Sequence, residues 1–148
     1  MSDYNELYQQ IILEHNKNPR HFKKLDSPDT LTSLGKNPLC GDHYYVAVDV
    51  AEDGSVQDIG FQGDGCAISK ASASLMSTRV LGKSRAEVLQ MRDEFQQMMT
   101  GELPAEHHLG KLTILEGVKE FPVRVKCATL CWHTLAAALQ GETETTTE

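Results

Sequence analysis

The sequence predicts an α+β domain in which a small three-stranded antiparallel sheet is packed with about five helices. Within residues 43–50, Val46, Val48 and Val50 recur at every second position, and residues 56–62 resume with strand-forming side chains. The segment 52–54 (Glu-Asp-Gly) between them is typical of a turn, so the two strands are expected to pair as an antiparallel hairpin. The third strand is expected within or close to residues 30–36, where no clear alternation marks it.

Five segments of the chain are expected to be helical. The first is capped by Asp3, carries apolar residues at helical spacing and ends near Asn18-Pro19. Ser84 and Glu87 have the spacing of a capping box, which gives the clearest helix start in the chain. The helices after the first are expected at residues 66–81, 84–101, 112–118 and from about 122 to 141.

Length and charge limit the organisation and the function. The 148 residues fit one domain, expected at residues 1–141, and the Thr/Glu-rich residues 142–148 are expected to form a disordered polar tail. Lys and Arg total 14 against 21 Asp and Glu, and the net charge of −7 disfavours binding to nucleic acid or to anionic membranes. The N-terminus lacks a signal-peptide pattern and no apolar run approaches bilayer-spanning length, so we expect a cytoplasmic protein.

The four cysteines are expected to be reduced thiols or metal ligands, because a cytoplasmic location disfavours disulfides. Cys40 and Asp42 precede a strand, Cys66 lies between a Gly-rich loop and a helix, and Cys127 lies near the start of the last helix. Such a set suits tetrahedral zinc or one edge of an iron–sulfur cluster. We expect the helix N-termini to favour deprotonation of Cys66 and Cys127. Spacing alone leaves open that these cysteines are only small buried hydrophobic residues, because no C-x-x-C pair is present.

Three segments resemble the signature segments of the IscU/NifU N-terminal family of iron–sulfur cluster assembly proteins. These segments are residues 37–42 (NPLCGD), 63–69 (GDGCAIS) and 124–130 (RVKCATL). The resemblance runs from about Tyr4 to Leu139 and implies an IscU-like fold. The chain is most similar to the SufU branch, because Lys126 stands where the IscU branch has a histidine and the stretch between the second and third segments is longer.

The resemblance implies that zinc is held by Cys40, Asp42, Cys66 and Cys127, and that Cys40 is the catalytic sulfur acceptor. Sulfur would come as persulfide from a SufS-type cysteine desulfurase and pass to a SufBCD-like scaffold, which is a sulfurtransferase-like activity. One alternative is a scaffold that itself assembles and transfers a [2Fe–2S] cluster, with a transient cluster or iron as its metal. A second alternative is a structural zinc domain that acts as an interaction module.

Six further residues have less direct interpretations. Cys131 follows Cys127 by one helical turn, but it falls within an apolar stripe and is expected to pack in the core. Arg124 either steers an anionic persulfide or pairs with an acid, and Lys126 is typical of a solvated helix charge. The pair His107-His108 is expected in an exposed loop, and His133 on a different helical face from Cys127, so these histidines are left out of the site.

Overall fold

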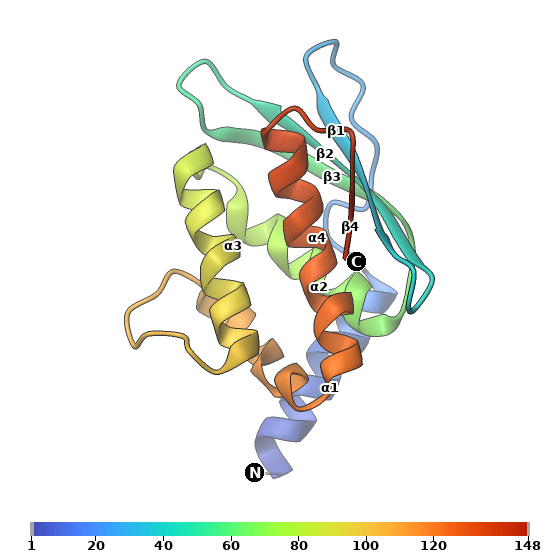
Figure 1. Cartoon of the computed structure of the whole chain (residues 1–148), viewed down its shortest axis with the longest axis vertical. Coiled ribbons are helices and arrows are strands. Elements are labelled where there is room, and N and C mark those ends of the chain that lie inside the picture. Colours follow the sequence, from blue (N-terminus) through green and yellow to red (C-terminus); the bar gives the residue numbers. More distant parts are fainter. Residues whose placement is uncertain (1, 148) are drawn as a thin grey trace.

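The computed structural model describes residues 2–147, with side chains described from Glu6 onward. Asp3, the expected N-cap of the first helix, therefore lies outside the described side chains. The elements follow the chain in the order α1 (Ser2–Lys17), β1 (Leu31–Asn37), β2 (Asp42–Val50), β3 (Val56–Asp64), α2 (Ala67–Val80), α3 (Arg85–Thr100), the 3-10 helix η1 (Gly110–Glu120), α4 (Pro122–Leu139) and β4 (Glu144–Thr146) (Figure 1). The predicted α+β class is confirmed.

The sheet has four strands in the order β3-β2-β1-β4, and it is mixed. The expected hairpin is confirmed as antiparallel β2 and β3, and the uncertain third strand is β1, antiparallel to β2. The prediction of a three-stranded antiparallel sheet is wrong, because β4 pairs parallel to β1. This strand comes from residues 142–148, expected to form a disordered tail.

Backbone groups explain why the sequence does not reveal β4. Two backbone hydrogen bonds hold the segment against β1. The amide of Leu34 donates to the carbonyl of Thr143 at 2.9 Å, and the amide of Thr147 donates to the carbonyl of Lys36 at 3.1 Å. Such bonds form whatever the side chains are, and the polar residues 144–146 carry no apolar alternation that would identify a strand.

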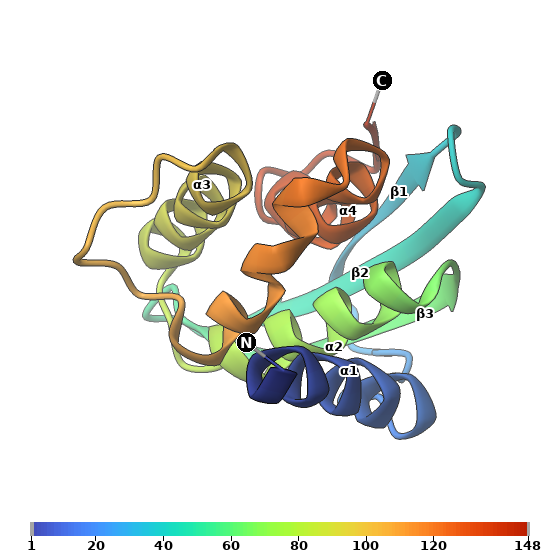
Figure 2. The ribbon, with the colours of Figure 1, turned by 90° about the horizontal axis from the view of Figure 1, so that it is seen from below.

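The helices form layers around α4. Figure 2 shows α1 and α2 side by side, with α4 between α3 and the sheet. The helix α4 is buried along most of its length and packs on β1 and β2 on one side and on α2 and α3 on the others. Its Trp132 packs against Phe95 of α3 with ring centroids 5.8 Å apart, and this aromatic contact stabilises the packing of α4 on α3. None of the helices in the described part of the chain has the length and apolar character needed to cross a bilayer.

One local feature confirms the sequence reasoning, and a second, which the sequence did not predict, fixes the approach of β1 to α4. Ser84 and Glu87 form both bonds of the capping box at the start of α3. Gly35 on β1 faces α4 so closely that a Cβ atom there would overlap Thr134 Oγ1 and lie 3.1 Å from Leu130 Cδ1. The absence of a side chain at Gly35 therefore lets α4 pack directly on the strand that leads to the predicted site.

Candidate metal centre

The turn between β1 and β2 positions Cys40 and Asp42. Asn37 and Asp42 are the last paired residues of the two strands, and the amides of Cys40 and Gly41 both donate to the Asn37 carbonyl, at 3.2 and 2.9 Å. Gly41 has φ of 73°, a left-handed conformation that favours glycine. Cys40 is half-buried within this turn, whereas Asp42 is buried at the first position of β2.

Cys66 is the N-cap residue of α2 and contacts the site through its backbone. Its amide donates to Asp42 Oδ1 at 2.9 Å, and its sulfur accepts from the amide of Ser69 at 3.4 Å. The preceding residue must be small, because a Cβ on Gly65 would lie 2.7 Å from Asp42 Oδ1 and 2.8 Å from Tyr44 Cε2. The Gly-rich loop thus brings the helix N-terminus against the Asp42 carboxylate.

Cys127 lies on α4 and is fully buried. Its thiol donates to the sulfur of Cys40 at 3.3 Å, which joins the last helix to the hairpin turn. Burial, followed by hydrogen bonding to Cys40 and Asp42, raises the pKa of Cys127. The expectation of easy deprotonation is wrong for this thiol, because α4 begins at Pro122 and Cys127 lies beyond its first turn.

The structure brings three of the four predicted ligands together. One ligand atom from each of Cys40, Asp42 and Cys127 lies within 4.8 Å of the other two. The thiol of Cys66 is not part of that group, although its backbone is bonded to Asp42. A tetrahedral zinc site with Zn–S bonds of about 2.3 Å places its sulfur atoms roughly 3.8 Å apart, so the clustered thiols and carboxylate fit zinc in chemistry and in spacing.

Two polar residues border this group. The guanidinium of Arg124 lies beside the thiols of Cys127 and Cys66, and its interaction with Cys127, followed by the charge of Cys66, raises the pKa of Arg124. Arg124 therefore lies against the cysteines, and its steering of a persulfide stays a prediction. Asn37 was missed by sequence reasoning, yet its side-chain amide is 3.4 Å from Asp42 Oδ2 and 3.5 Å from Cys127 Sγ.

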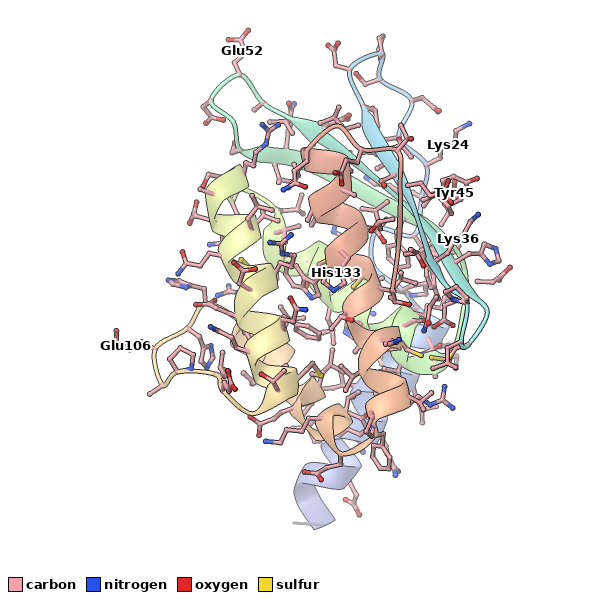
Figure 3. The ribbon with its side chains drawn as sticks, in the orientation of Figure 1. Lys24, Lys36, Tyr45, Glu52, Glu106 and His133 are labelled. Atoms are coloured by element: carbon pink, nitrogen blue, oxygen red, sulfur yellow. The ribbon has the colours of Figure 1, made fainter. Side chains whose placement is uncertain are left out.

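The remaining candidates lie away from the cluster. Cys131 packs in the core next to Ser72 Oγ at 3.4 Å, and burial raises its pKa to about 12. His108 contacts the buried carboxylate of Glu94 on α3, at 3.1 Å. Figure 3 shows His133 midway along α4, where it lines a hollow between α3, α4 and β4 together with the exposed Lys126. The choice to leave the histidines outside the site agrees with these positions.

Comparison with known proteins identifies the family. The family model described as the NifU-like N terminal domain matches residues 7–128, which include all four predicted ligands. The chain belongs to the NifU-like N-terminal domain family. A member of this family with a known structure has the same fold. A NifU-like N-terminal protein of Brucella abortus superposes with a TM-score of 0.81 at 26% identity, covering 90% of this chain and 92% of that one.

Relatives carrying two different names are similarly close to this family member. The zinc-dependent sulfurtransferase SufU of Bacillus subtilis is 40% identical over 137 residues, covering 92% of this chain and 91% of the relative. The iron–sulfur cluster assembly scaffold protein IscU of Streptococcus pyogenes is 41% identical over 141 residues, covering 95% and 87%. A protein of Fervidobacterium islandicum, described as a scaffold for the SUF system, superposes with a TM-score of 0.79 at 32% identity, covering 88% and 94%.

Proposed function

We propose that this protein serves iron–sulfur cluster assembly in the cytoplasm as a zinc-dependent acceptor of persulfide sulfur. Zinc would be held by Cys40, Asp42, Cys66 and Cys127, and Cys40 would receive sulfur from a SufS-type cysteine desulfurase and pass it to a SufBCD-like scaffold. The observation that carries the proposal is the cluster of Cys40, Asp42 and Cys127 at the tip of the β1–β2 hairpin. The similarity to a zinc-dependent sulfurtransferase supports the same interpretation.

Cys40 is the acceptor in this proposal because it is the accessible thiol of the cluster. It is half-buried in a turn next to Leu39, whose side chain is 63% exposed, whereas Cys127 is fully buried within α4. A partner that carries a persulfide on a surface loop has to reach the acceptor directly, since thiol exchange requires contact between the two sulfur atoms.

The transfer is a thiol–disulfide exchange that needs no external oxidant or reductant. The Cys40 thiolate attacks the terminal sulfur of the desulfurase persulfide, the S–S bond of that persulfide breaks, and the desulfurase cysteine leaves as a thiolate. Cys40 then carries the persulfide, and Arg124, exposed beside the cluster, supplies a positive charge near the anionic group. Zinc, when bound, would stabilise the thiolate form of its cysteine ligands at neutral pH.

A scaffold that assembles a [2Fe–2S] cluster is the second candidate, favoured by the similarity to proteins named IscU. Thiolates also ligate such clusters, so the same donors could hold one edge of a cluster.

A structural zinc domain that acts as an interaction module is the third candidate. Removal of zinc with a chelator separates this last candidate from the others. The core around Trp132 and Phe95 does not include the site, so the fold should survive metal loss if zinc is functional.

The proposal is tested by incubating the protein with a cysteine desulfurase and cysteine without oxygen. Peptide mass spectrometry should then find one added sulfur atom on Cys40. The variant Cys40→Ala should carry none, while Cys131→Ala, which removes a buried cysteine outside the cluster, should be loaded like the wild type. Loading of a different cysteine, or of none in the wild type, would refute the acceptor role.

A further inference from the structure

Asn37 lies at the centre of the hydrogen bonds around the candidate metal centre. It is the last residue of β1, its side chain is fully buried, and its carbonyl accepts from both Cys40 and Gly41. The side-chain Nδ2 donates to Asp42 Oδ2 at 3.4 Å and to Cys127 Sγ at 3.5 Å. One residue thus contacts the turn that carries Cys40 and two further members of the cluster.

The opposite end of the Asn37 amide is held by the C-terminal segment. Thr147 follows β4, and its hydroxyl donates to Asn37 Oδ1 at 2.9 Å while its backbone amide donates to the Lys36 carbonyl at 3.1 Å. A carboxylate only accepts hydrogen bonds, so the amide nitrogen must face Asp42 and the amide oxygen must face Thr147. The carboxylate therefore selects the orientation of the Asn37 side chain, and the Thr147 hydroxyl satisfies the amide oxygen at the opposite end.

We propose that Asn37 is a positioning residue of the metal centre, and that the C-terminal segment, through Thr147, holds the oxygen end of its amide in place. The inference rests on the proposed function, because it assigns Asn37 a role toward the metal that Cys40, Asp42, Cys66 and Cys127 would hold. Groups that hydrogen-bond to metal ligands orient those ligands, and their loss typically weakens metal binding.

The arrangement also distinguishes the two clustered sulfur atoms. The Asn37 amide donates to the sulfur of Cys127. The sulfur of Cys40 accepts no bond from that amide, and its contact within the described residues is the thiol of Cys127. Asn37 thus holds the buried sulfur of Cys127 in place and leaves the half-buried sulfur of Cys40 free of that amide.

Three substitutions in the full chain and one matched control test the inference. Asn37→Leu removes both donors and the acceptor with little change in size, and Thr147→Val removes only the hydroxyl bond to Asn37. Thr147→Ser keeps the hydroxyl and is the rescue variant. Thr143→Val is the control, because Thr143 is in the same segment but is exposed and contacts β1 through its backbone carbonyl.

The measurements are zinc affinity by competition with a chelator, the visible spectrum of the cobalt-substituted protein, and thermal unfolding of the metal-free protein. We expect Asn37→Leu to weaken zinc binding on the order of 10- to 100-fold. Thr147→Val should weaken it roughly two- to tenfold, the ratio expected from one hydrogen bond. Both should shift the cobalt spectrum, which a purely structural role would leave unchanged, and Thr147→Ser and Thr143→Val should match the wild type.

Unchanged zinc affinity and an unchanged cobalt spectrum in Asn37→Leu would overturn the inference. If that variant does not fold, Thr147→Val decides, since its substitution is confined to an edge segment, and wild-type behaviour in it would overturn the inference equally. A wild-type protein that binds neither metal would refute the proposed function as well. Wild-type binding combined with unaffected variants would refute the inference about Asn37 alone.

Discussion

Replacing Gly35 by alanine tests how the close contact between β1 and α4 positions the metal centre. The added Cβ would overlap Thr134 Oγ1 and would lie 3.0 Å from Thr134 Cβ and 3.1 Å from Leu130 Cδ1. Because these neighbours belong to a packed helix, the helix has to move away from the strand, and such overpacking costs about 1–3 kcal/mol in the free energy of unfolding. Cys127 moves with α4 while Cys40 follows β1, so zinc affinity should fall together with stability.

Urea unfolding and competition for zinc with a chelator measure the two effects. The substitution Thr134→Ala removes the hydroxyl that the new methyl group would overlap. Gly35→Ala should therefore cost less stability and less zinc affinity when it is introduced into Thr134→Ala than when it is introduced into the wild type. The reasoning is refuted if Gly35→Ala has wild-type stability and zinc affinity. It is also refuted if the losses in the double variant equal the summed losses of the two single variants.

Three other substitutions have distinct expected outcomes. Asp42→Ala should reduce zinc retention in a chelator competition, because it removes a clustered ligand and the acceptor for the Cys66 amide; unchanged affinity would argue against ligation. Burial raises the pKa of Cys131 to about 12 from 9.0, so only the unfolded chain loses this proton as pH rises between those values. The free energy of unfolding, measured in urea, should therefore decrease over that range, and less steeply in Cys131→Ala; equal slopes would contradict this. Ser84→Ala should lower the free energy of unfolding by about 0.5–2 kcal/mol while zinc affinity stays unchanged, and thermal unfolding beside zinc titration checks both halves.

Features that depend on neighbouring residues could be predicted from the sequence. The alternation of Val46, Val48 and Val50 predicted β2, and the spacing of Ser84 and Glu87 predicted the start of α3, because both patterns act within a few residues. The fold class followed from such local patterns. The β1 strand was harder, since Ser33, Gly35 and Asn37 face the interior without being apolar.

Features that depend on contacts between distant segments could not be predicted in the same way. Spacing alone leaves the convergence of Cys40, Asp42 and Cys127 open, because Cys127 is 87 residues from Cys40 in the chain, and only the family resemblance predicts it. The strand β4 is held by backbone bonds that leave no pattern in its side chains. Asn37 opens the signature segment 37–42, but its contacts could not be predicted, since its side chain acts only once α4 and the C-terminal segment lie against β1.

The metal and acid-labile sulfide content of the protein, purified without oxygen beside Cys40→Ala, tests the central claim most directly. The account predicts about one zinc per chain without sulfide in the wild type, and less or more easily lost zinc in the variant, because a four-ligand site loses one thiolate. Iron with acid-labile sulfide would contradict the sulfur-acceptor account in favour of a cluster scaffold. Absence of metal from both proteins would contradict the metal centre itself.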